Sequence, residues 1–160
     1  YLIGTMNTAD RNISLVDHAL RRRFLIVQCL PDADLLNGYL EGNSALDESK
    51  RNTIKEIFQA VQKAFYKENT QEYARDQRGY FMGDYAIGHT YFMTKDLEDL
   101  WTNLRYQVIP LLEEYRKEGI LTEDHLRRSA LHIQEMKNPN QGENISWLLN
   151  WCKSIIEHYN

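Results

Sequence analysis

Apolar side chains recur at helical spacing along most of the chain, and this periodicity constrains the fold more than any other feature. Residues 47–67 and 94–119 each place their apolar side chains three or four positions apart, with charged residues between them. Such spacing gives a helix one apolar face, which must pack against other elements. Residues 123–136 and 144–159 show the same pattern. The sequence therefore predicts a mainly α-helical fold.

The first 32 residues follow a different pattern. Residues 1–6 and 24–30 are short apolar runs that predict buried strands, and residues 13–20 between them predict a helix. Strands that are apolar on both faces are typical of the interior of a larger parallel sheet. We therefore expect a strand-helix-strand remnant of an α/β sheet ahead of the helical region.

Residues 69–93 interrupt the helical pattern. Six aromatic residues alternate with three glycines there, which predicts a loop with short extended segments. We expect Thr94 to cap the helix that follows. Pro110 lies within the apolar face of that helix and predicts a kink or break near Ile109. Gly119 is expected to end the helix.

Composition excludes several classes of protein. The chain has 19 Lys and Arg residues against 23 Asp and Glu residues, and a formal net charge of −4. This balance argues against nucleic-acid binding by bulk charge, and leaves direct binding through Arg21–Arg23 and Arg127–Arg128 as a weak alternative. The two cysteines, Cys29 and Cys152, cannot form a disulfide framework, and no cysteine or histidine has zinc-finger spacing. We expect no metal site of the protein's own.

Apolar runs in the chain are short. None approaches the roughly 18 residues that a membrane-spanning helix needs, and the N-terminus lacks the pattern of a signal peptide. We therefore expect a cytoplasmic protein with reduced thiols.

The side chains best suited to chemistry lie within the first 24 residues. Asn7 follows the first predicted strand, at the end where α/β sheets bind ligands, and could orient a water or contact a phosphate. From its position alone, a turn asparagine that satisfies local backbone groups is the favoured interpretation. Three consecutive arginines, Arg21–Arg23, end the predicted helix, where they suit the negative end of its dipole. Alternatively, one guanidinium reaches a phosphate on a neighbouring subunit.

Four segments, taken together and in order, resemble the signatures of a known family. They are residues 6–11 (MNTADR), 19–24 (ALRRRF), 87–92 (IGHTYF) and 109–115 (IPLLEEY). Together they resemble the McrB-type AAA+ proteins, which are the NTP-driven motor subunits of restriction systems directed at modified cytosine. The similarity runs from residue 4 to about residue 118.

The resemblance implies catalytic roles for three residues. Asn7 matches the sensor 1 residue, which helps to position the attacking water beside the γ-phosphate. The arginine run matches the region of the trans-acting arginine finger, in which Arg22 is the first candidate and Arg23 the second.

The same resemblance implies contacts with the nucleotide. Asp10 and Arg11 fall in the signature loop, for which nucleotide and subunit contacts are implied. His89 falls where a lid residue could approach the nucleotide, by analogy with sensor 2. A structural histidine packed among aromatic residues is an equal alternative for His89.

The resemblance also implies a division into domains. Residues 1–32 would be the C-terminal end of an α/β AAA+ subdomain, residues 33–118 an all-α lid, and residues 119–160 a helical extension. The sequence contains neither the phosphate-binding Gly-x-x-x-x-Gly-Lys-Ser/Thr nor an apolar strand that ends in an acidic pair. We therefore expect the nucleotide-binding half to precede residue 1, and this chain alone to be inactive.

In the full-length protein, the resemblance implies GTP or ATP with Mg²⁺ as the substrate. It also implies self-association into a ring, a nuclease subunit as partner, DNA contacts through domains outside this chain, and no membrane. The alternative is a non-catalytic helical adaptor in which residues 33–160 bind a protein partner. In that case the helix with Trp147 and Trp151 would be the docking surface.

Overall fold

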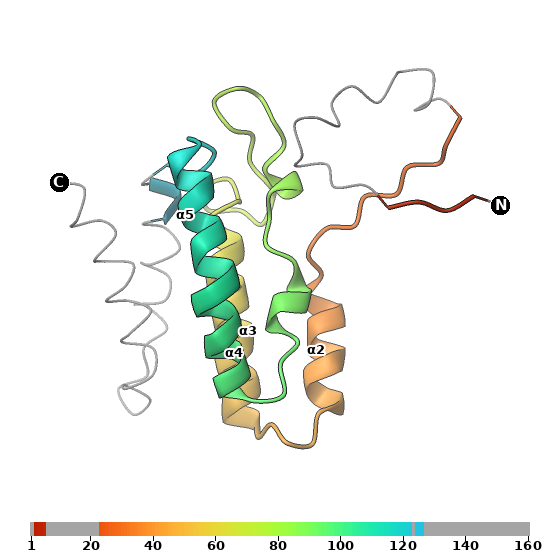
Figure 1. The fold of residues 1–160 in the computed structure, drawn as a ribbon, viewed down its shortest axis with the longest axis vertical. Helices are drawn as coiled ribbons and strands as arrows, with labels where there is room; N and C mark the ends of the chain where they lie inside the picture. The colour runs from red at the N-terminus through yellow and green to blue at the C-terminus, as the bar shows by residue number, and fades with distance from the viewer. Residues whose placement is uncertain (1, 6–22, 123, 127–160) are drawn as a thin grey trace.

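The computed structural model describes residues 2–5, 23–122 and 124–126, and these are mainly helical, as predicted (Figure 1). In chain order the elements are α2 (Ala33–Gly42), α3 (Glu48–Lys63), η2 (Met82–Asp84), η3 (His89–Phe92), α4 (Leu97–Asn103), η4 (Leu104–Val108) and α5 (Ile109–Lys117). α4, η4 and α5 form one long column beside α3, and the segment that carries η2 and η3 lies between this column and α2 (Figure 1). The short helix η3 contacts α2, α3 and α4.

Aspartates define the start of each main helix. The Asp32 carboxylate accepts hydrogen bonds from the backbone N–H groups of Asp34 and Leu35 at 2.8 and 3.0 Å. The Asp47 carboxylate accepts from the N–H of Lys50 at 2.9 Å. These bonds satisfy donors that a helix N-terminus leaves free. The structure thus confirms a helix within residues 47–67, with α3 ending at Lys63.

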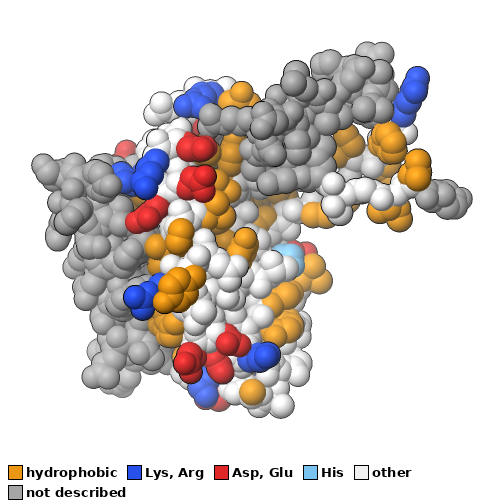
Figure 2. Space-filling model, in the orientation of Figure 1, with side chains coloured by type: hydrophobic (Ala, Val, Ile, Leu, Met, Phe, Trp, Pro, Cys, Tyr) orange, Lys and Arg blue, Asp and Glu red, His pale blue; other side chains and the backbone are white. Residues whose placement is uncertain are grey.

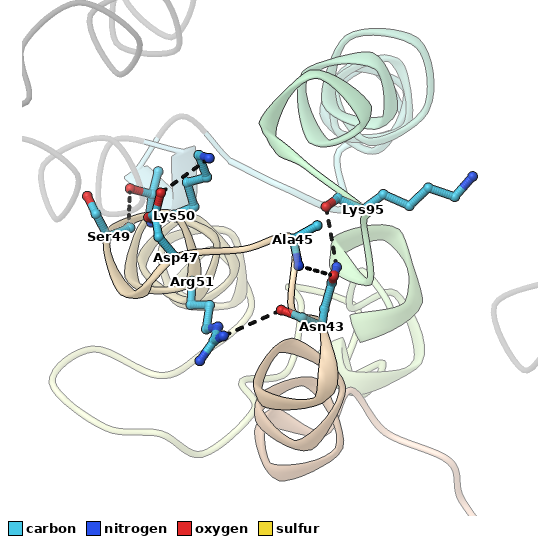
Figure 3. Close-up of polar contacts among 8 residues, drawn as sticks. Asn43, Ala45, Asp47, Ser49, Lys50, Arg51 and Lys95 are labelled. Carbon is cyan, nitrogen blue, oxygen red and sulfur yellow. Dashed lines mark hydrogen bonds and ion pairs between the residues drawn. The ribbon is translucent and has the colours of Figure 1, made fainter.

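The turn between α2 and α3 is tied to the segment before α4 (Figure 3). The Asn43 side chain donates to the backbone carbonyls of Thr94 and Lys95, both at 3.3 Å, and accepts from the Ala45 N–H at 3.0 Å. The Arg51 guanidinium donates to the Asn43 carbonyl at 3.4 Å. The Asn43 side-chain amide therefore joins parts of the chain about fifty residues apart, and holds residues 94–95, which follow η3, in place.

The α4–α5 column begins at a different cap from the one expected. Asp96 caps α4 by accepting from the Asp99 N–H at 2.8 Å, so the prediction of Thr94 as the cap is wrong. Thr94 is instead buried, with 3% of its surface exposed. The carboxylate of Asp96 is a stronger acceptor than a hydroxyl for helix N–H groups.

Pro110 changes the helix without ending it. Residues Leu104–Val108 form a π-helical turn in which the Ile109 N–H donates to the Leu104 carbonyl, five residues earlier. A proline has no N–H, and its ring would clash with the carbonyl four residues before it in a regular α-helix. A widened turn just before Pro110 accommodates both effects. The predicted irregularity is present, and α5 continues to Lys117.

Gly119 ends α5, as predicted. Its φ angle is +70°, which favours glycine. The Gly119 N–H donates to the Arg116 carbonyl at 3.0 Å, and the Ile120 N–H donates to the Tyr115 carbonyl at 2.9 Å. This pair of bonds is the Schellman motif that commonly closes helices.

The core lies between α2, α3, η3 and the α4–α5 column. Phe92 of η3 is fully buried, and its ring lies edge-on to Phe58 of α3 with centroids 5.2 Å apart. Gln62, only 1% exposed, donates to the Ile87 carbonyl at 2.7 Å. Its side-chain oxygen accepts from the Tyr73 hydroxyl at 3.4 Å. The loop of residues 66–92 is therefore fixed to α3 by both apolar and polar contacts.

The expected strands are not seen among the residues that the structure describes. Residues 2–5 and 24–30 belong to no strand within the described part of the chain, whose only extended pairing is two isolated bridges. Leu25 and Val27 are 92% and 71% exposed. A strand exists through hydrogen bonds to a neighbouring strand, and the described residues provide none here. The predicted helices at residues 13–20 and 144–159 lie outside the described residues, while residues 124–126 of the predicted helix 123–136 are helical.

Two half-buried tyrosines predict a loss of stability at high pH. Burial, followed by the nearby Glu114 carboxylate, raises the pKa of Tyr115 to about 12, and burial raises the pKa of Tyr73 still further. A raised pKa in the folded state means that the stability these phenols contribute is complete below pH 10 and falls as pH rises through about 12.

We therefore expect the free energy of unfolding in urea to fall between pH 9.5 and 11.5, and the Tyr115→Phe variant to lose less over this range. The exposed Tyr106→Phe variant is the matched control and should lose as much as the wild type. Equal losses in all three proteins would contradict this prediction.

Candidate functional site

Residues 28–32, here called the linker, run along the loop segment of residues 83–89. The Gln28 side-chain amide donates to the Asp84 carboxylate at 3.1 Å. A Cβ added at Gly83 would clash with the Phe81 ring and would lie 3.0 Å from Leu30 Cδ2, so glycine permits the close approach of both side chains. The Asp32 backbone N–H donates to Nδ1 of His89 at 3.0 Å. Alternate residues of the linker therefore make three contacts that join it to residues 83–89.

His89 is held in a defined position at this junction. It begins η3, whose Phe92 is buried in the core and whose Tyr91 carbonyl accepts from the Asn103 side chain at 3.0 Å. His89 itself is half-buried. Its ring orientation is set by the bond from Asp32.

The bond from Asp32 also determines the histidine tautomer. A backbone N–H can only donate, so Nδ1 of His89 must carry a lone pair. Neutral His89 therefore has its proton on Nε2. Among the described residues, Nε2 has no hydrogen-bond partner. It is a positioned donor that a ligand could use.

The structure describes two of the predicted site residues, His89 and Arg23, and does not bring them together. Arg23 is exposed and makes no hydrogen bond or ion pair within the described part of the chain. The segment that starts there runs well outside the helices before it reaches α2 (Figure 1). The other predicted site residues lie outside the described residues: Asn7, Asp10, Arg11 and Arg22.

Sequence reasoning missed Gln28, Asp32 and Asp84. A signal for Asp32 was present, because an aspartate just before a helical run is a common N-cap. The pairing of Gln28 with Asp84 spans 56 residues and has no local sequence signal. Long-range pairs of this kind depend on how the loop of residues 66–92 packs.

A hollow of about 620 Å³ lies elsewhere on the surface. None of the predicted site residues lines it; the lining residues are Arg75, Asp76, Gln77, Gly119, Ile120, Thr122, Asp124 and His125. The described residues contain no cluster of three or more side chains that could hold a metal ion. Within the same residues, no helix has the length and apolarity to cross a membrane.

Hydrophobic side chains also gather beside the junction, over α2 and the segment before it (Figure 2). Leu35 and Tyr39, one turn apart on α2, are 57% and 38% exposed. Phe24 and Ile26 are 53% and 56% exposed. This apolar surface adjoins the linker and is available for contact with other parts of a larger protein.

Comparison with known families indicates what the second half of the helical part resembles. Residues 77–119 match the family described as "McrB, alpha-helical lid domain". These residues are similar to an McrB-type lid. The match extends from the loop before η2 to the glycine that ends α5, so Asp84, His89 and the Pro110 motif all lie within the matched residues.

A curated relative supports the same assignment. The chain is 34% identical over 125 residues to the "Type IV methyl-directed restriction enzyme EcoKMcrB subunit" of Escherichia coli (strain K12). The similarity covers 72% of this chain and 25% of that protein, so the chain spans about a quarter of its relative's length. No solved structure matched the chain significantly. The expected resemblance to McrB-type proteins is thus confirmed, and it extends beyond the McrB-type lid itself.

Proposed function

We propose that this chain is the C-terminal part of the AAA+ module of an McrB-type NTPase, and that its helices form the lid over a bound nucleotide. The observation that carries the proposal is the McrB-type lid at residues 77–119. The similarity to a subunit named as a restriction enzyme supports a role in a DNA restriction system. In this proposal residues 1–32 end the α/β subdomain, residues 33–118 form the lid and residues 119–160 extend it.

The substrate in this proposal is GTP or ATP with Mg²⁺, bound by the full-length protein. His89 fits a role toward a phosphate, because Nε2–H is a positioned donor without a partner among the described residues. Asp10 and Arg11 would add contacts to the nucleotide. The described residues offer no carboxylate cluster for Mg²⁺, so its ligands would lie elsewhere in the full-length protein.

The remaining predicted residues would act on hydrolysis. Asn7 would orient the attacking water within its own subunit. Arg22, with Arg23 as the second candidate, would stabilise charge on the phosphates bound by a neighbouring subunit. These roles require assembly into a ring. We propose a nuclease subunit as a partner, DNA bound through domains outside this chain, and a location in the cytoplasm.

A substitution at His89, with a control at Thr90, tests the contact with the nucleotide in the full-length protein. The amide of an asparagine overlaps the Nδ1 position of histidine, so His89→Asn keeps an acceptor for Asp32 and loses the Nε2 donor. We expect it to weaken GTP or ATP binding by about fivefold to tenfold, the effect of one hydrogen bond. Thr90→Ala, at the exposed neighbouring position, is the control and should bind normally.

Equilibrium binding with a fluorescent nucleotide gives the readout. Unchanged affinity in His89→Asn would remove His89 from the nucleotide site. A full-length protein that binds neither nucleotide would overturn the proposed NTPase and favour the non-catalytic adaptor, for which exposed Leu35 and Tyr39 provide a surface.

A further inference from the structure

We propose that His89 is a latch that holds the linker to residues 83–89, and so ties the end of the α/β subdomain to the lid. This inference rests on the proposed function, because it takes residues 83–89 as part of the lid and residues 28–32 as the end of the α/β subdomain. Its observable consequences in this chain do not require nucleotide.

The linker is clamped at both ends and in the middle. Gln28 is bonded to Asp84, Leu30 lies against Gly83, and the Asp32 N–H is bonded to His89. Asp32 has a double role, since its backbone N–H meets His89 while its carboxylate caps α2. Fixing this one residue therefore fixes both the end of the linker and the start of α2.

The two nitrogens of His89 couple this latch to the nucleotide site. The latch needs a lone pair on Nδ1, which exists in neutral histidine only when Nε2 carries the proton. A phosphate that accepts from Nε2–H favours the same tautomer. Bound nucleotide therefore strengthens the latch, and its release weakens it.

A matched pair of variants separates the two nitrogens. The amide of glutamine overlaps Nε2, so His89→Gln keeps a donor toward the ligand and loses the acceptor for Asp32, whereas His89→Asn does the reverse. In the 160-residue chain without nucleotide, we expect the Asp32 amide to exchange with solvent about fivefold to tenfold faster in His89→Gln than in the wild type. His89→Asn and the control Thr90→Ala should exchange at nearly the wild-type rate.

The wild-type chain provides a test that needs no substitution. The ¹⁵N chemical shifts of His89 should report the Nε2–H tautomer. The Nδ1–H tautomer, or an Asp32 exchange rate in His89→Gln equal to that of the wild type, would overturn the latch. Because both measurements omit nucleotide, failure of the latch leaves the nucleotide-binding test unaffected, and a protein that binds no nucleotide leaves the latch measurements intact.

Discussion

Replacing Arg22 with alanine in the full-length protein is expected to lower NTP turnover by roughly 10³-fold or more, while nucleotide affinity stays within a few-fold of wild type. An arginine supplied by a neighbouring subunit stabilises charge that develops on the phosphates in the transition state, and such fingers contribute about 10³–10⁵ to the rate. An interaction made mainly in the transition state lowers turnover more than ground-state binding. Steady-state hydrolysis and equilibrium nucleotide binding, measured on the same protein, separate these two quantities.

Mixed assemblies test whether the arginine acts in trans. An Asn7→Ala subunit keeps its arginine, and an Arg22→Ala subunit keeps its Asn7, so an interface between the two can be complete although each variant alone is deficient. We expect a mixture of the two inactive variants to regain part of the wild-type turnover. Arg21→Ala is the control, because we expect Arg21 to have a structural role rather than to be the arginine finger. Wild-type turnover in Arg22→Ala would reject Arg22 as the arginine finger. A loss of turnover in Arg23→Ala instead would identify Arg23 as the finger.

The largest expected loss of stability comes from Phe92→Ala. Phe92 is fully buried, packs edge-on against Phe58 and anchors η3 between α2, α3 and α4. Removing a buried phenylalanine side chain typically costs about 3–5 kcal/mol, from lost transfer free energy and from the cavity that remains. Since a small domain is stable by only about 5–15 kcal/mol, we expect a substantial part of its stability to be lost.

Urea unfolding followed by circular dichroism measures this loss. Tyr106→Ala is the control, because Tyr106 is 68% exposed and its removal should change the free energy of unfolding by less than about 0.5 kcal/mol. A loss below about 1 kcal/mol in Phe92→Ala would show that η3 is not anchored through this ring. Because His89 begins the same short helix, the variant should also speed exchange of the Asp32 amide.

Local chemistry explains why the helices and their ends could be predicted. The apolar spacing of residues 47–67 anticipated α3, and Gly119 anticipated the end of α5 through the backbone conformation that glycine favours. Pro110 predicted an irregularity because proline lacks an N–H, although a π-helical turn rather than a break resulted. Thr94 was the wrong cap because the choice between two nearby cap residues depends on which of them packing buries.

The predicted strands are not seen among the described residues for a related reason. The apolar runs at residues 1–6 and 24–30 have the composition of strands, but strand formation requires partners, and the described residues supply none. The composition of a segment indicates whether it can adopt a strand conformation. Whether a strand forms depends on hydrogen bonds to other strands, which are distant in the sequence.

By itself, the sequence determined the helices within residues 47–67 and 94–119, several helix ends and the resemblance to McrB-type proteins, because each depends on residue spacing within one segment or on short motifs. It also marked His89 as a candidate. Only the tertiary structure decided what His89 contacts, since Asp32 lies 57 residues away and meets it only once η3 has packed between α2 and α4. The hydrogen bond that sets the His89 tautomer leaves Nε2 as a donor without a partner among the described residues. This bond depends on packing, which no local sequence pattern encodes.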